Sequence, residues 1–223
     1  MNPQQKAFWE TIKILSDVNI LDKFIIIGSW VEYLYEIAYL VDYKSYLKTM
    51  DADLLIKNIN LFKKNKFNLP SLFENHGFVY FEEPLTGITK FFKAGIFEVE
   101  FLVRELGKGH LEPYKIDGLG IKVEGLRHME ILCNYTTWIN ANNYSICVPI
   151  PQAYIIHKLV INDKRGAKKE KDLRAVKNLL LTLQISEEEI LKLKIVYAGL
   201  FKSEKKKVKK VCIENAIDLF GCY

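Results

Sequence analysis

The sequence lacks the features that mark several large classes of protein. Its 223 residues contain no run of about 18 consecutive apolar residues, so we expect no membrane-spanning helix. Residues 1–10 are polar and lack the apolar core of a signal peptide, which indicates a cytoplasmic protein. None of the four cysteines forms a Cys-x-x-Cys pair, and we expect reduced thiols, as in cytosolic proteins.

Histidine is also scarce, and the chain shows no internal repeat and no long low-complexity segment. The four histidines have no spacing typical of metal ligands, and we expect His157 to pack within a helix. The overall composition is that of an ordinary globular protein, with 49% hydrophobic and 26% charged residues.

Positive charge is concentrated in the last third of the chain. From Pro149 onward there are 16 Lys and Arg against 9 Asp and Glu, whereas the first 148 residues carry 16 against 18. A basic face attracts polyanions such as nucleic acid or triphosphates. The alternative, a solvated lysine-rich surface with no binding role, has equal weight on charge alone.

The spacing of apolar residues predicts an α+β part followed by helices only. The first part is predicted to contain helices over 3–18 and 30–40, a short helix between Pro70 and Gly77, and strands over 24–27, 50–56, 78–81, 88–92, 96–103 and 144–148. The stretch that holds Gly107, Gly109, Gly118 and Gly120 is predicted to be a loop. Pro149 and Pro151 mark a boundary, after which helices are predicted over 152–164, 168–183, 187–200 and 204–219. We therefore predict two domains, 1–148 and 149–223.

Two aspartates on a predicted strand are the first candidates for chemistry. Side chains alternate along a strand, so Asp51 and Asp53 point to the same face, with their α-carbons roughly 6.6 Å apart. Two carboxylates that close repel each other unless a cation lies between them. The pair therefore indicates a site for one small cation.

A third carboxylate is predicted on the strand over 96–103. Glu98 and Glu100 alternate there with apolar residues and share one face, where an acid needs a partner or a metal. Mg²⁺ prefers hard oxygen ligands, which two aspartates and a glutamate supply. Either glutamate fits this position.

Phosphate-binding groups are predicted between the first strand and its helix. Gly28 and Ser29 lie at a strand end, where Ser29 is expected to cap the helix and free backbone N–H groups to cradle phosphate. Thr49, at the start of the second strand, is a further candidate for phosphate contact. A phosphate cradle beside a carboxylate set is typical of metal-assisted phosphoryl or nucleotidyl transfer.

At these residues the chain resembles the nucleotidyltransferase-fold superfamily, the DNA polymerase β-like group. The shared pattern is a strand, Gly28-Ser29, a helix, Asp51 and Asp53 on the next strand, and a later strand acid at Glu100. The resemblance implies a nucleotidyltransferase-like mixed β-sheet flanked by helices and followed by a C-terminal helical bundle. It also implies Mg²⁺ or Mn²⁺ on Asp51, Asp53 and Glu100. The connector over 39–48 is longer than is usual in this group and is read as an insertion.

The C-terminal part resembles a bacterial branch of minimal nucleotidyltransferases that includes AbiEii-type toxins of toxin–antitoxin systems. The match lies in Pro149 and Pro151, a helix with Lys158, a basic loop with Arg165, and Lys171-Asp172 opening the next helix. The resemblance implies that Lys158 and Asp172 belong to the active site. We expect Lys158 and Arg165 to neutralise phosphate charge and Asp172 to orient a basic neighbour.

These observations predict an enzyme that moves an NMP from an NTP to a hydroxyl acceptor. The acceptor is expected to be RNA, such as tRNA, or a protein, and the enzyme is expected to be the toxin of a toxin–antitoxin pair with an antitoxin partner. The alternative is an inactive module of the same fold that binds nucleic acid or a protein partner. Nothing in the sequence identifies the NTP.

Overall fold

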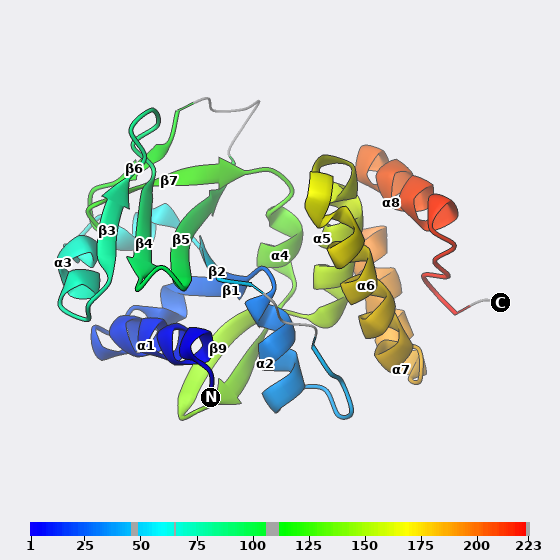
Figure 1. The fold of residues 1–223 in the computed structure, drawn as a ribbon. Helices are drawn as coiled ribbons and strands as arrows, with labels where there is room; N and C mark the ends of the chain where they lie inside the picture. The colour runs from blue at the N-terminus through cyan, green and yellow to red at the C-terminus, as the bar shows by residue number, and fades with distance from the viewer. Residues whose placement is uncertain (46–48, 65, 106–111, 222–223) are drawn as a thin grey trace.

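The computed structural model describes residues 1–45, 49–64, 66–105 and 112–221 (Figure 1). The predicted loop positions Gly107 and Gly109, the end of the 39–48 connector, His110 and Cys222 lie outside these ranges. In chain order the helices and strands are α1 (Pro3–Asp17), β1 (Phe24–Ile27), α2 (Trp30–Ala38), β2 (Asp51–Ile56), α3 (Leu69–Glu74), β3 (Val79–Glu82), β4 (Thr89–Lys93), β5 (Phe97–Arg104), β6 (Tyr114–Ile116), β7 (Ile121–Leu126), α4 (Glu130–Asn134), β8 (Thr136–Ala141), β9 (Tyr144–Pro149), α5 (Pro151–Ile161), α6 (Lys169–Leu183), α7 (Glu187–Ala198) and α8 (Lys202–Glu214).

A mixed β-sheet forms the centre of the N-terminal part. Its strand order is β1-β2-β5-β4-β3, with β7 beside β5 and β6 beside β7. β2 runs parallel to β5, and β5 runs parallel to β7, whereas the other neighbours are antiparallel. Strands β8 and β9 form a separate hairpin. The predicted α+β fold, a mixed sheet flanked by helices with helices at its C-terminal end, is confirmed.

The two faces of the sheet differ in character. On one face Phe97, Val99 and Phe101 join the main core, which includes the buried side of α1. Phe8 of α1 stacks on Trp30 of α2 with ring centroids 4.4 Å apart, which ties both helices to this core. The other face carries a small apolar cluster around residues such as Leu55, and its remaining positions are free for polar side chains.

The C-terminal helices pack around α5, which contacts α6, α7 and α8 on one side and α4 on another (Figure 1). Two hydrogen bonds join this part to α2. Tyr35 donates to the carbonyl of Pro149 at 2.6 Å, and Tyr154 of α5 donates to Glu32 Oε1 at 2.6 Å. One core cluster runs from Ala7 to Leu219. The parts on either side of residue 148 therefore share their hydrophobic interior.

Most predicted elements are present with ends shifted by a few residues. The turn before β5 is the predicted hairpin, with Ala94 and Gly95 both at positive φ. The prediction missed β6, β7, α4 and β8. Glycines at 118 and 120 led to a loop assignment, but Ile121 and Val123 alternate with polar residues and are buried on one side of β7.

The structure also bears on two features that the sequence analysis considered, membrane-spanning helices and cysteines. No helix within the described residues is long and apolar enough to cross a membrane. Cys133, Cys147 and Cys212, the cysteines that the described ranges contain, are all free thiols.

Candidate active site

Four carboxylates lie together on one face of the sheet. β2 and β5 are parallel neighbours, and their register places Asp51 opposite Glu98 and Asp53 opposite Glu100. Residues that are paired across neighbouring strands point to the same face of a sheet, and so do residues two positions apart on one strand. All four side chains therefore lie on the face away from the main core. The two acidic strand segments predicted from the sequence therefore form a single acidic surface.

Gly28 allows the chain to pass close to this surface. It follows β1, whose residue Ile27 pairs with Asp53, and it has φ of 71°. A Cβ atom at this position would lie 2.3 Å from Asp53 Oδ2. Only glycine fits both the backbone conformation and the distance to the carboxylate.

Ser29 and Thr49 lie at the edge of the same site. Ser29 is the N-cap residue of α2, as predicted, but among the described residues its side chain forms no capping hydrogen bond. Ser29 also lines the cavity. The Thr49 hydroxyl accepts a hydrogen bond from the Asp51 backbone N–H at 3.4 Å, which orders the start of β2.

Asp53 has the most perturbed carboxyl group of the four. Burial raises its pKa to about 7, and the nearby charges of Glu100 and Asp51 add to this effect. Lys158 and Lys168 oppose the shift without cancelling it. Burial and two neighbouring carboxylates thus disfavour the charged form of Asp53, and a bound cation would favour it.

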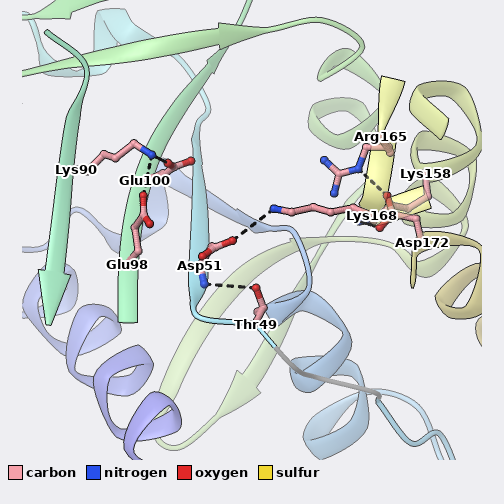
Figure 2. Close-up of polar contacts among 9 residues, drawn as sticks. All are labelled: Thr49, Asp51, Lys90, Glu98, Glu100, Lys158, Arg165, Lys168 and Asp172. Carbon is pink, nitrogen blue, oxygen red and sulfur yellow. Dashed lines mark hydrogen bonds and ion pairs between the residues drawn. The ribbon is translucent and has the colours of Figure 1, made fainter. Parts of the chain in front are cut away.

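Lys90 of β4 compensates part of this charge and was missed in the sequence. It pairs with Glu100 across the sheet, and its ammonium contacts both Glu100 and Glu98, the latter at 2.8 Å (Figure 2). Lys90 lies on the predicted strand over 88–92, but its role depends on strand pairing, which the sequence does not contain.

The C-terminal helices supply the opposite wall of the site. Lys158 of α5 donates to Asp172 Oδ1 at 2.7 Å, and Arg165 donates from Nε to Asp172 Oδ2 at 2.6 Å (Figure 2). The side chains of Lys158 and Asp172 are only 5% and 4% exposed. Asp172 thus fixes two cations at once, as expected for an acid that orients basic neighbours.

Lys168 connects the two walls. It ends the 3-10 turn Gly166–Lys168, and its ammonium lies 3.5 Å from Asp51 Oδ2 (Figure 2). This contact was not predicted, although the sequence did indicate a basic loop at this point. Its side chain is 63% exposed, so the contact is open to exchange with a ligand.

A cleft with two lobes runs between the walls. The outer lobe, of about 630 Å³, is lined by Ser29, Thr49, Lys171 and Asp172 among others, and the inner lobe, of about 430 Å³, by Lys90, Glu98 and Glu100 among others. Both lobes are lined by Gly28, Asp51, Asp53, Lys158, Arg165 and Lys168. All nine site residues predicted from the sequence, Gly28, Ser29, Thr49, Asp51, Asp53, Glu100, Lys158, Arg165 and Asp172, therefore line one cleft.

A buried hydrogen-bond network supports the cationic wall from behind. Glu32 of α2 accepts from Tyr154 at 2.6 Å and from Tyr43 at 3.3 Å, and the Lys158 ammonium lies 5.2 Å from the centre of the Tyr154 ring. Burial raises the pKa of Glu32. His157 is buried in α5, as expected, and burial lowers its pKa to about 3.

The carboxylates of the cleft are suitable ligands for a divalent cation, but their present arrangement is less suitable than their chemistry. Aspartate and glutamate oxygens suit Mg²⁺ or Mn²⁺, and burial, with the charges of Glu100 and Asp51, raises the pKa of Asp53. However, no group of three or more His, Cys, Asp or Glu side chains is arranged to hold one ion in the part of the chain that the structure describes. Glu100, the predicted third ligand, contacts Lys90 instead.

Comparison with known proteins identifies the family. No curated protein matches the sequence. The structure is similar to that of an antigenic nucleotidyltransferase-like protein from Paracoccidioides brasiliensis, with a TM-score of 0.53, 12% identity, and coverage of 96% of this chain and 88% of that chain. At this identity the likeness shows the fold alone, and it confirms the nucleotidyltransferase-like sheet. A family model described as nucleotidyltransferase matches residues 7–195 and includes all nine predicted site residues, so the chain belongs to this nucleotidyltransferase family.

Proposed function

We propose that the protein transfers an NMP from an NTP to a hydroxyl acceptor, with Mg²⁺ or Mn²⁺ bound at Asp51 and Asp53. The observation that carries the proposal is the division of one cleft into a carboxylate wall and a cationic wall. Carboxylates suit the metal, and lysine and arginine suit the triphosphate. The membership of the chain in a nucleotidyltransferase family supports the same reaction.

The cationic wall is assigned to the triphosphate. Lys158 and Arg165 are held by Asp172, so they present fixed positive charge without having to be ordered by the substrate. Lys168 contacts Asp51 through an exposed side chain and would exchange that contact for a phosphate oxygen. Three cations on one side of the cleft offset much of the charge of a nucleoside triphosphate.

The carboxylate wall is assigned to the metal, which we place at Asp51 and Asp53; Glu100, the third ligand that the resemblance implies, contacts Lys90. When bound, the metal neutralises charge on the phosphate and lowers the pKa of the attacking hydroxyl. The hydroxyl oxygen forms a new bond to the α-phosphorus and releases its proton to water, and the bond from this phosphorus to the leaving pyrophosphate breaks. Gly28 allows the backbone to lie beside Asp53, close to the place of reaction.

The acceptor is proposed from charge. The residues from Pro149 onward carry the excess of Lys and Arg; α5 and α6 line the cleft, and α7 and α8 pack against α5. RNA, including tRNA, is therefore the preferred acceptor, and a protein hydroxyl is the next. The role of a toxin with an antitoxin partner is proposed only from the resemblance of the sequence to AbiEii-type toxins.

One observation favours a second candidate, a module that binds nucleic acid or a protein without catalysis. Lys90 lies between Glu98 and Glu100 and so reduces the number of carboxylates that are open to metal. Such a module would retain the cationic wall and bind anions, but it would not release pyrophosphate.

Incubation with each α-labelled NTP, Mg²⁺ or Mn²⁺, and total RNA or lysate tests the reaction. We expect label to move from one NTP to a macromolecule, and Asp51→Asn combined with Asp53→Asn to abolish the transfer. Asp22→Asn changes an exposed acid near the opposite end of β1 and serves as a matched control that should retain activity. Absence of transfer and of pyrophosphate release with every NTP would favour the binding module.

A further inference from the structure

Strand pairing fixes the position of Lys90 beside the two carboxylates of β5. The Cα register places Lys90 directly opposite Glu100, and Glu98 is two residues further along the same face. The ammonium contacts Glu98 at 2.8 Å and Glu100 at a shorter distance. Since the side chain is 29% exposed, the pair of contacts is partly sheltered from water.

The two lysines of the carboxylate surface differ in how easily an ion would displace them. Lys168 contacts only Asp51, at 3.5 Å, through a side chain that is 63% exposed. Lys90 contacts two glutamates from within the sheet, through a side chain that is 29% exposed. A divalent ion therefore replaces the Lys168 contact at a smaller energetic cost than the Lys90 contacts.

A second ion at Glu100 would also lie beside a positive charge. Two cations within a few ångströms repel each other strongly in a partly buried site. The carboxylates that remain for a metal are Asp51, whose lysine contact is exposed, and Asp53, which lines both lobes of the cleft. The acidic surface is thus divided into a lysine-bound half and a metal-accepting half.

We propose that Lys90 takes the place of one of the two cations of a two-metal site, so that the protein binds a single divalent ion at Asp51 and Asp53. This inference rests on the proposed function, because it assumes that the aspartates bind metal. It makes Lys90 a positioning residue that holds Glu98 and Glu100 and supplies one positive charge permanently.

The test is the number of Mn²⁺ ions bound per chain, measured by electron paramagnetic resonance during titration with Mn²⁺ alone. We expect one ion for the unmodified protein and two for Lys90→Met, which frees Glu98 and Glu100. Lys93→Met is a matched control on the same strand, because Lys93 contacts Glu10 and the His76 carbonyl on the opposite face. It should bind one ion.

Two ions in the unmodified protein, or one ion in a folded Lys90→Met, would overturn the inference. Circular dichroism checks that Lys90→Met is folded. If it is not, Glu100→Gln in the otherwise unmodified chain gives a second test. If Glu100 binds no ion, the loss of its charge should lower the Mn²⁺ affinity less than tenfold, through the electrostatic effect of a neighbouring carboxylate alone, whereas a fall of tenfold or more would overturn the inference.

The metal-binding assumption is tested separately. Asp51→Asn with Asp53→Asn should remove the single ion, whatever the state of Lys90. An ion that persists in this double variant would contradict the proposed metal site, and the inference with it. If the double variant loses its ion but the unmodified protein binds two ions, the proposed metal site stands and only the inference about Lys90 is contradicted.

Discussion

Lys158 and Asp172 contact each other at 2.7 Å across the interface between α5 and α6, and both side chains are almost completely buried. They are 14 positions apart in the sequence and lie on different helices. Charges so deeply buried require partners, and Asp172 obtains a second partner in Arg165. The cationic wall of the cleft therefore depends on a single carboxylate.

Asp172→Ala is expected to destabilise the protein by about 3–5 kcal/mol, the range for removing one member of a buried ion pair. The cause is that Lys158 remains buried without its counter-charge. Lys158→Met should cost less, because Asp172 keeps Arg165. Urea denaturation measures both changes, and Lys115→Met, in an exposed pair with Asp117, is a control with a small effect. Equal losses for Asp172→Ala and Lys158→Met would contradict this account.

Gly28→Ala is expected to be more harmful than the same substitution at another glycine with positive φ. Gly95 has φ of 65°, and no other atom lies within 4 Å of the place that a Cβ would occupy, so Gly95→Ala isolates the conformational cost of roughly 1–2 kcal/mol. At Gly28 the new methyl group meets Asp53 Oδ2 at 2.3 Å, so the carboxylate must move. Thermal unfolding and Mn²⁺ binding distinguish the two. Similar stability and Mn²⁺ affinity in both variants would show that the contact with Asp53 has no consequence.

How much of the site could be predicted depended on local sequence pattern. Asp51 and Asp53 alternate on one strand, and alternation alone places them on one face. Gly28 was predicted at a strand end as part of a phosphate cradle, whereas its close approach to Asp53 depends on the pairing of β1 with β2. Only the shared face of the two aspartates required no knowledge of the tertiary fold.

Lys90 and Lys168 could not be predicted in the same way. Lys90 acts through its register with Glu100, and register depends on which strands pair. Lys168 acts by crossing the cleft to Asp51, which is distant in the sequence. β7 was missed for a similar reason, because its position in the sheet depends on pairing with β5. The nearby glycines favoured a loop more strongly than the alternation of apolar residues favoured a strand.

Acid is expected to weaken the protein through His157. Its pKa is lowered by burial to about 3 in the folded state, from 6.5. The unfolded chain therefore binds the extra proton first, so the stability associated with neutral His157 is complete above pH 6.5 and is lost as the pH falls toward 3. His157→Leu removes this dependence. Between pH 7.5 and pH 5 we expect the unmodified protein to lose about 2 kcal/mol relative to the variant in urea denaturation. An unchanged difference at the two pH values would rule out this role.

Lys168→Met is expected to change nucleotide and metal binding in opposite directions. Loss of a cation that would contact the triphosphate should raise the KM for the NTP roughly tenfold, equivalent to about 1.4 kcal/mol of binding energy. Loss of the same cation from Asp51 removes a competitor for the metal, so Mn²⁺ should bind more tightly. Lys192→Met, on α7 and paired with Glu188 and Glu189, is a matched control that should change neither quantity. If Lys168 had a purely structural role, its loss would weaken NTP binding and Mn²⁺ binding together. Initial-rate kinetics and Mn²⁺ titration therefore decide between the two explanations.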